Sequence, residues 1–128
     1  MRLLLDTHVL LWALAEPERL SPLATAALVS PQNAVLVSAV SAWEIAIKQS
    51  LNKIELPGPA ETWLPAAIEQ TGFGWLDIRP TDALRVRGLP WHHRDPFDRM
   101  LVAQAGDDFT LVTHDKSFDA YAVTVLPA

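Results

Sequence analysis

The sequence contains no cysteine among its 128 residues, which excludes disulfide bonds and thiolate metal ligands. Any metal ion must therefore be held by oxygen or imidazole donors. The chain also lacks a stretch close to the ~18 uninterrupted apolar residues that a membrane-spanning helix needs. Asp6 and His8 interrupt the first apolar run, so this run is interpreted as a buried strand rather than a secretory signal peptide. These absences favour a cytoplasmic protein that does not enter the membrane.

The sequence also has no excess of basic residues, because its formal net charge is −5. A general nucleic-acid-binding protein usually has a basic face that displaces counterions from phosphates. The acidic balance argues against that class, but not against an enzyme that acts on nucleic acid, because carboxylates that bind a divalent cation count as negative in the sum. Five arginines are concentrated in one part of the chain and are compatible with a local basic rim: Arg79, Arg85, Arg87, Arg94 and Arg99.

Short apolar segments alternate with helical patterns along the chain. Half of the residues are hydrophobic, and no repeat, low-complexity tract or long linker divides the sequence, so we expect a single domain over residues 1–128. Strands are expected at 2–6, 34–38, 75–78, 109–113 and 123–126. Helices are expected at 9–15, from 21, at 40–51, 60–70 and 81–87, from 95 and at 116–121, with caps at Ser21, Thr81 and Asp95 and a left-handed terminator at Asn52.

This alternation predicts an α/β fold with a mostly parallel sheet covered by helices on both faces. In such folds, ligands bind outside the carboxyl ends of the strands, where the strand order reverses. Asp6 and Asp115 lie at or just past strand ends, and Glu44 and Asp98 lie in first helical turns or just beyond. We therefore expect these four acidic residues to form one carboxylate-lined metal site.

Two of these acids also have structural interpretations. Asp6 is placed where a helix N-cap would stand, although Thr7 would serve as the cap equally well. If Asp6 is a metal ligand instead, the Thr7 hydroxyl would orient Asp6 or a metal-bound water. Glu44 forms a capping box with Ser41, unless the helix starts nearer Ser38. In that second case Glu44 is a buried carboxylate in the middle of a helix and needs a cation.

The other two acids face similar alternatives. Asp95 is interpreted first as an N-cap, because a proline follows it at the first helical position. Asp95 and Asp98 repel each other at one helix end, and a divalent ion would relieve that repulsion, with Asp98 preferred as the ligand. Asp115 is either a ligand or a cap. The histidines lack HxxxH or HxH spacing, so His92 and His93 are interpreted as loop residues.

Four segments, DTHVLLW, SAVSAWEIAIK, RDPFDRMLVAQA and LVTHDKSF, occur in this order. With them the chain resembles PIN-domain proteins of the VapC type, the toxin half of toxin–antitoxin pairs. The resemblance implies a PIN-like three-layer α/β/α domain, Mg²⁺ or Mn²⁺ dependence, ribonuclease activity on RNA, a homodimer and a VapB-type antitoxin partner. It places catalytic metal ligands at Asp6, Glu44, Asp98 and Asp115, with Asp95 as an extra acid and supporting hydroxyls at Thr7 and Thr113.

Phosphodiester hydrolysis needs charge neutralisation and an activated water, both of which Mg²⁺ or Mn²⁺ supplies. One or two ions would satisfy this chemistry. Arg94 and Arg99 are the expected RNA contacts. Two alternatives stay open: phosphotransfer through an aspartyl-phosphate at Asp6, although His8 stands where a second acid is expected, and a catalytically degenerate PIN-like module that only binds or regulates.

Overall fold

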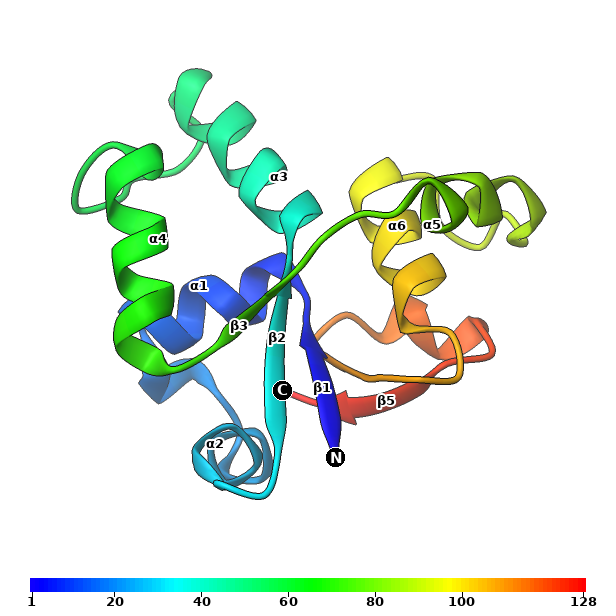
Figure 1. The fold of residues 1–128 in the computed structure, drawn as a ribbon, viewed down its shortest axis with the longest axis horizontal. Helices are drawn as coiled ribbons and strands as arrows, with labels where there is room; N and C mark the ends of the chain where they lie inside the picture. The colour runs from blue at the N-terminus through cyan, green and yellow to red at the C-terminus, as the bar shows by residue number, and fades with distance from the viewer.

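The computed structural model describes all residues, 1–128, and contains one five-stranded parallel sheet (Figure 1). Its strands are β1 (Arg2–Leu5), β2 (Ala34–Ser38), β3 (Gly74–Leu76), β4 (Thr110–Thr113) and β5 (Thr124–Pro127). The strand order is β3-β2-β1-β4-β5. The chain moves outward from β1 to β3 and then crosses back to β4, so the order reverses between β1 and β4. A ligand site is therefore expected at the carboxyl ends of these two strands.

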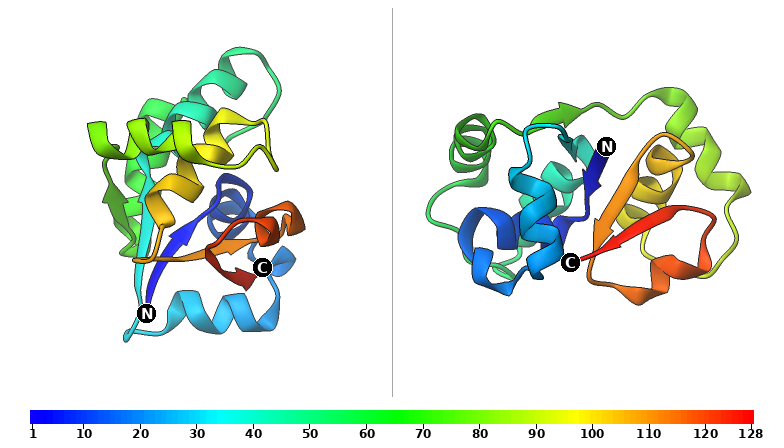
Figure 2. Two further views of the ribbon diagram at one scale, coloured as in Figure 1. Left: turned by 90° about the vertical axis from the view of Figure 1, so that its right-hand side faces the viewer. Right: turned by 90° about the horizontal axis from the view of Figure 1, so that it is seen from below.

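Helices cover both faces of the sheet (Figure 2). The α-helices are α1 (Thr7–Ala15), α2 (Pro22–Val29), α3 (Ala39–Ser50), α4 (Ala60–Thr71), α5 (Pro80–Arg85) and α6 (Pro96–Ala105). Three short 3₁₀ helices are η1 (Pro17–Arg19), η2 (Val86–Gly88) and η3 (Lys116–Ala120). None of the helices is long and apolar enough to cross a bilayer.

The all-leucine β1 strand is buried on both of its faces. Leu3 and Leu5 pack with residues of α1, α2 and α4, whereas Leu4 packs on the opposite face with residues of α6 and η3. This division follows from the geometry of a strand, whose successive side chains point to opposite faces. Helix α3 contributes to both clusters, through Ile45 and Val40. The expected three-layer α/β/α arrangement around a parallel sheet is thus confirmed.

All expected segment boundaries agree with the structure within two residues, and three local predictions are confirmed. Ser21 Oγ accepts a hydrogen bond from the Ala24 amide at 3.0 Å, so it caps α2. Asp95 caps α6 by accepting from the Phe97 amide at 2.8 Å. Asn52 follows α3 with a φ of 56°, the left-handed conformation that ends many helices.

The structure decides between the two alternatives for Glu44, and one expected cap is wrong. Helix α3 begins at Ala39 with Ser38 as its cap, which confirms the alternative in which Glu44 is a buried carboxylate inside the helix, without a capping box to Ser41. Thr81 does not cap α5, because the helix begins one residue earlier, at Pro80. The expected helix over residues 116–121 is the 3₁₀ helix η3.

Candidate metal centre

Asp6 and Thr113 stand side by side at the carboxyl ends of β1 and β4. The Asp6 amide donates to the Val112 carbonyl at 3.1 Å and extends the pairing of the two strands by one residue. The Thr113 hydroxyl donates to Asp6 Oδ2, while Asp6 Oδ1 caps α1 by accepting from the Val9 amide at 2.8 Å. Asp6 is 4% exposed. Its carboxylate is therefore held in one orientation at the switch point of the sheet.

Glu44 reaches the same region from the interior of α3, where it is 3% exposed. Its Oε1 accepts from the Thr7 hydroxyl at 2.7 Å, and its Oε2 accepts from Lys48 Nζ at 2.6 Å. The structure thus pairs the Thr7 hydroxyl with Glu44 rather than with Asp6, one of its two expected partners. A buried carboxylate with two such partners is oriented and partly charge-compensated.

His93, Asp98 and Asp115 form a close group of side chains with donor atoms suited to a metal ion. His93 Nε2 lies 3.0 Å from Asp98 Oδ2 and 3.3 Å from Asp115 Oδ2. One donor atom from each residue can be chosen such that all three lie within 4.8 Å of one another. Donors at these separations fit around one divalent cation, given metal–oxygen distances of about 2.0–2.6 Å. Loop residue His93 is the member that the sequence did not reveal.

The pKa of Asp98 reflects both its burial and the negative charge near it. Burial raises the pKa of Asp98 to about 7; the Asp95 charge adds to the rise, His93 opposes it, and Glu44 and Asp6 increase it further. The charges of Asp95, Glu44 and Asp6 therefore lie near enough to Asp98 to influence it. A divalent cation among them would replace this repulsion with attraction, so the residues fit such an ion.

Asp6 and Asp115 differ in their environments. Burial raises the pKa of Asp6, and hydrogen bonds from Thr113 and the Val9 amide only partly offset this effect. Burial also raises the pKa of Asp115, but hydrogen bonds from Ser117 and His93 outweigh it and hold that pKa below its ordinary value. Asp115 is therefore the more readily charged of the two, and Asp6 gains more from a nearby cation.

The Asp95 carboxylate is engaged as the N-cap of α6. Besides the Phe97 amide, its Oδ1 accepts from the Asp98 amide at 3.4 Å. Asp98, one helical turn on, is the carboxylate that meets His93. Asp95 and Asp98, which the sequence left as alternative ligands, therefore have different surroundings: Asp95 caps the helix, and Asp98 contacts His93.

Arg99 does not reach the surface, contrary to its expected role as an RNA contact. It is 2% exposed, and its guanidinium carbon lies 3.7 Å from the centroid of the Trp91 ring. The guanidinium donates to four backbone carbonyls at 2.9–3.3 Å, those of Val86, Leu89, Pro90 and His93. Arg99 therefore organises the loop that carries His93. Arg94 is exposed and free to contact a ligand.

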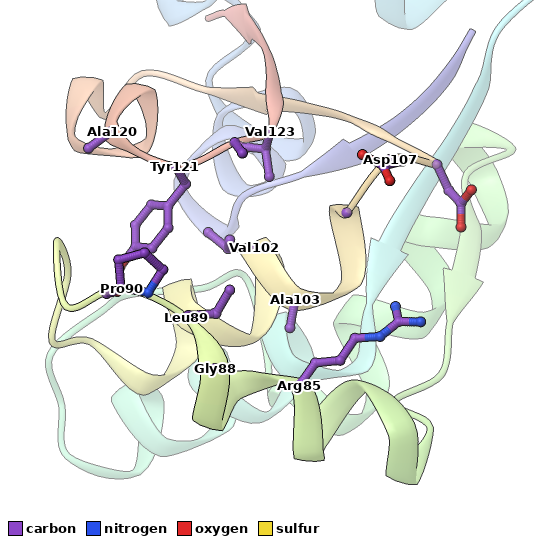
Figure 3. A pocket seen from close by; sticks show the side chains of 13 residues that line it. Arg85, Gly88, Leu89, Pro90, Val102, Ala103, Asp107, Ala120, Tyr121 and Val123 are labelled. Carbon is purple, nitrogen blue, oxygen red and sulfur yellow. The ribbon is translucent and has the colours of Figure 1, made fainter.

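A hollow of about 620 Å³ lies apart from the candidate metal centre, between η2, α6 and the segment before β5 (Figure 3). Its walls include Arg85, Leu89, Val102, Tyr121 and Val123. None of the four candidate metal-site carboxylates lines it. The Tyr121 hydroxyl accepts from the His93 amide at 2.9 Å and donates to the Pro90 carbonyl at 3.0 Å. Tyr121 thus braces the same loop as Arg99.

Comparison with known proteins places this chain in a family. Residues 3–123 match the PIN domain. The sequence is 35% identical to Ribonuclease VapC22 of Mycobacterium tuberculosis over 115 aligned residues. The alignment covers 88% of this chain and 86% of that protein. Ribonuclease VapC16 of the same organism is 38% identical over 47 residues, 37% of this chain and 33% of that protein.

Solved structures share the fold. The crystal structure of VapBC2 from Rickettsia felis bound to a DNA fragment from their promoter matches with a TM-score of 0.69 and 14% identity, over 99% of this chain and 98% of that chain. FitAcB from Neisseria gonorrhoeae matches with a TM-score of 0.61 and 24% identity, over 97% of this chain and 96% of that chain. With the PIN match over nearly its whole length and a close VapC relative, the chain belongs to the PIN-domain family and is of the VapC type.

Proposed function

We propose that this protein is an endoribonuclease that hydrolyses RNA phosphodiester bonds with the help of Mg²⁺ or Mn²⁺. The observation that carries the proposal is the convergence of Asp6, Glu44, Asp98 and Asp115 at the carboxyl end of the sheet. His93 Nε2 lies within 3.3 Å of both Asp98 and Asp115, and the charges of Glu44 and Asp6 add to the effect of burial in raising the pKa of Asp98. The similarity to Ribonuclease VapC22 supports RNA as the substrate.

The acidic residues would have different roles at this centre. Asp98 and Asp115 would ligate the ion together with His93, and Asp6 would complete the set from the end of β1. Thr113 fixes the orientation of Asp6. When bound, the ion supplies charge neutralisation at the transition state and lowers the pKa of water. These oxygen donors suit Mg²⁺ and Mn²⁺, and one imidazole does not change that class.

Glu44 would act beside this ligand set. Thr7 and Lys48 hold its two carboxylate oxygens, so the side chain keeps one direction while substrate binds. From there it either contributes to a second ion or accepts the proton of the attacking water. Lys48 would offset the charge of Glu44 before RNA and the ion arrive.

The aspartyl-phosphate alternative gains no support from Asp6. A nucleophilic carboxylate needs an oxygen that approaches phosphorus freely, whereas both oxygens of Asp6 accept hydrogen bonds, from the Val9 amide and the Thr113 hydroxyl. A carboxylate in this state still has lone pairs for a cation. The arrangement therefore favours Asp6 as a metal ligand.

We also propose that the protein is the toxin of a VapBC-type pair, acts in the cytoplasm, forms a homodimer and is inhibited by a VapB-type antitoxin. The VapC relatives support this assignment. Trp43, Trp75 and Trp91 are exposed large apolar side chains that a second copy or a partner protein would cover.

RNA cleavage by the purified protein tests the proposed function. We expect cleavage with Mg²⁺ or Mn²⁺, no cleavage with excess chelator, and loss of cleavage in Asp6→Asn and Asp98→Asn. Asp107→Asn is the matched control, because Asp107 is an exposed acid outside the carboxylate group. Full activity of the Asp6 and Asp98 variants would refute the carboxylate mechanism, and a folded, metal-binding protein that cleaves no RNA would favour the degenerate module.

A further inference from the structure

A cavity of about 680 Å³ opens beside the candidate metal centre, and Asp6 and Asp115 form part of its lining. Four of the five remaining lining residues carry basic side chains: His8, Arg19, His114 and Lys116. All four are exposed to solvent. The cavity thus joins the acidic centre to a group of basic side chains from two distant parts of the sequence, and its volume lies within the range of about 300–1,000 Å³ that is common for ligand pockets.

Trp12, the fifth of these lining residues, holds two of the basic side chains in place. The Arg19 guanidinium carbon lies 4.8 Å from the centroid of the Trp12 ring, and the His114 ring meets that ring edge-on with centroids 5.3 Å apart. Arg19 also pairs with Glu16 at 3.0 Å, but both side chains are at least half exposed. An ion pair so exposed contributes little to folding. The guanidinium is therefore positioned at the cavity without being required by the core.

The electrostatics of the whole protein favour such a group for an anionic substrate. The chain has a net charge of −5, and basic side chains beside the acidic centre would attract a phosphate backbone to it. Arg99, the last arginine of the arginine-rich segment, is buried and donates to backbone carbonyls. Arg19 and Lys116 share a cavity with Asp6 and Asp115, and Lys116 forms no ion pair.

We propose that this cavity is an RNA subsite that binds the phosphate adjacent to the scissile one, with Arg19 and Lys116 as its principal contacts. The inference rests on the proposed ribonuclease function. Arg19 would bind phosphate oxygens with its planar guanidinium, whereas Lys116 would act as a point charge. Trp12 would keep Arg19 directed at the strand.

The test is RNA binding by Arg19→Ala, Lys116→Ala and the double variant, each made in an Asp98→Asn background so that binding is measured without cleavage. The probe is a fluorescein-labelled single-stranded oligoribonucleotide, followed by anisotropy over a range of salt concentrations. We expect the double variant to bind roughly tenfold more weakly at low salt. The slope of log K against log salt should become shallower by about 0.7 for each phosphate contact removed.

Lys53→Ala is the matched control, because Lys53 is an exposed lysine that does not line the cavity. In protein with an intact centre, the Arg19 and Lys116 substitutions should raise KM more than they lower kcat. Binding, salt slope and KM that change no more than in Lys53→Ala would overturn the subsite and leave the ribonuclease proposal standing. A native protein that cleaves no RNA would refute the ribonuclease proposal, and the anisotropy measurements would still decide whether the cavity binds RNA.

Discussion

His93 Nε2 lies 3.0 Å from Asp98 Oδ2, so a loop residue meets the first turn of α6 inside the candidate metal centre. Arg99 and Tyr121 hold this loop in place through its backbone. An imidazole that is fixed between two carboxylates is available to the ion that those carboxylates bind. Imidazole nitrogen suits transition-metal ions better than Mg²⁺, so His93 gives the site a means of distinguishing Mn²⁺ from Mg²⁺.

The first prediction concerns this selectivity. We expect His93→Asn to weaken Mn²⁺ binding about tenfold while Mg²⁺ binding changes little, because the variant loses a nitrogen ligand that Mn²⁺ uses better. Isothermal titration calorimetry of the metal-free protein with each ion measures both affinities. His92→Asn is the control, since the neighbouring His92 is exposed and outside the ligand group. Equal losses for the two ions would mean that His93 only shapes the site.

The second prediction separates the two arginines that the sequence suggested as RNA contacts. Arg99→Ala removes a buried guanidinium that donates to four loop carbonyls, and the carbonyls of Leu89 and His93 lose a donor that Tyr121 and the Leu89 amide do not replace. We therefore expect it to lower the free energy of unfolding by about 3–5 kcal/mol. Arg94→Ala changes an exposed side chain and should alter stability by less than about 0.5 kcal/mol. Urea unfolding followed by circular dichroism compares the two variants. Equal stability would contradict the enclosed position of Arg99.

The third prediction follows from the raised pKa of Asp98. In the unfolded chain this carboxyl group ionises near 3.8, and in the folded protein near 7. Between these values the folded state binds more protons, so the contribution of Asp98 to stability falls as the pH rises through this interval and is lowest above it. Asp6 shifts in the same direction.

We therefore expect the metal-free protein to melt at a lower temperature near pH 8 than near pH 5, with a smaller difference in Asp98→Asn. The depressed pKa of Asp115 and that of Asp82 act only below their ordinary value of 3.8, outside this interval. Added Mn²⁺ should restore stability at the higher pH by mass action. Calorimetric scans at both pH values check this expectation, and a melting temperature that rises toward pH 8 would contradict it.

The fourth prediction concerns the hydroxyl that orients Asp6. Thr113→Val removes the only side-chain donor to Asp6 and preserves the shape of the residue. Removing such a supporting hydrogen bond typically costs about 10–100-fold in metal affinity or activity, and we expect a loss in this range. Thr110→Val is a matched control on the same strand. The rate of RNA cleavage at saturating metal and the Mn²⁺ affinity both report the effect, and a variant with native values would remove Thr113 from the site.

The position of Asp6 was predictable because a continuous apolar run followed by an acid marks the end of a buried parallel strand, and Asp115 was predictable because it lies two residues past the end of another such strand. The environment of Glu44 was not predictable from local sequence, since Ser38 and Ser41 are both suitable N-caps. Tertiary structure determines which serine is the cap. Ser38 is the last residue of β2, where it pairs with Leu76 of β3, and it caps α3 directly afterwards.

The functions of Arg99 and His93 were hidden for a different reason. Arg99 donates to backbone carbonyls of residues 6 to 13 positions earlier, and carbonyl groups leave no pattern in a sequence. The same hydrogen bonds fix the loop that brings His93 to Asp98. In the sequence, an arginine in a helix is readily interpreted as a surface contact, and only the path of the loop in the structure shows that Arg99 is enclosed.

The most direct measurement compares Mn²⁺ binding with Mn²⁺-dependent RNA cleavage in the same preparation. Calorimetry gives the affinity of the metal-free protein for Mn²⁺, and initial cleavage rates give the Mn²⁺ concentration for half-maximal activity. We expect the two values to agree, and both binding and cleavage to be lost in Asp98→Asn while Asp107→Asn retains them. Cleavage at the native rate by Asp98→Asn, or by the unaltered protein in excess chelator, would contradict a carboxylate-held metal centre.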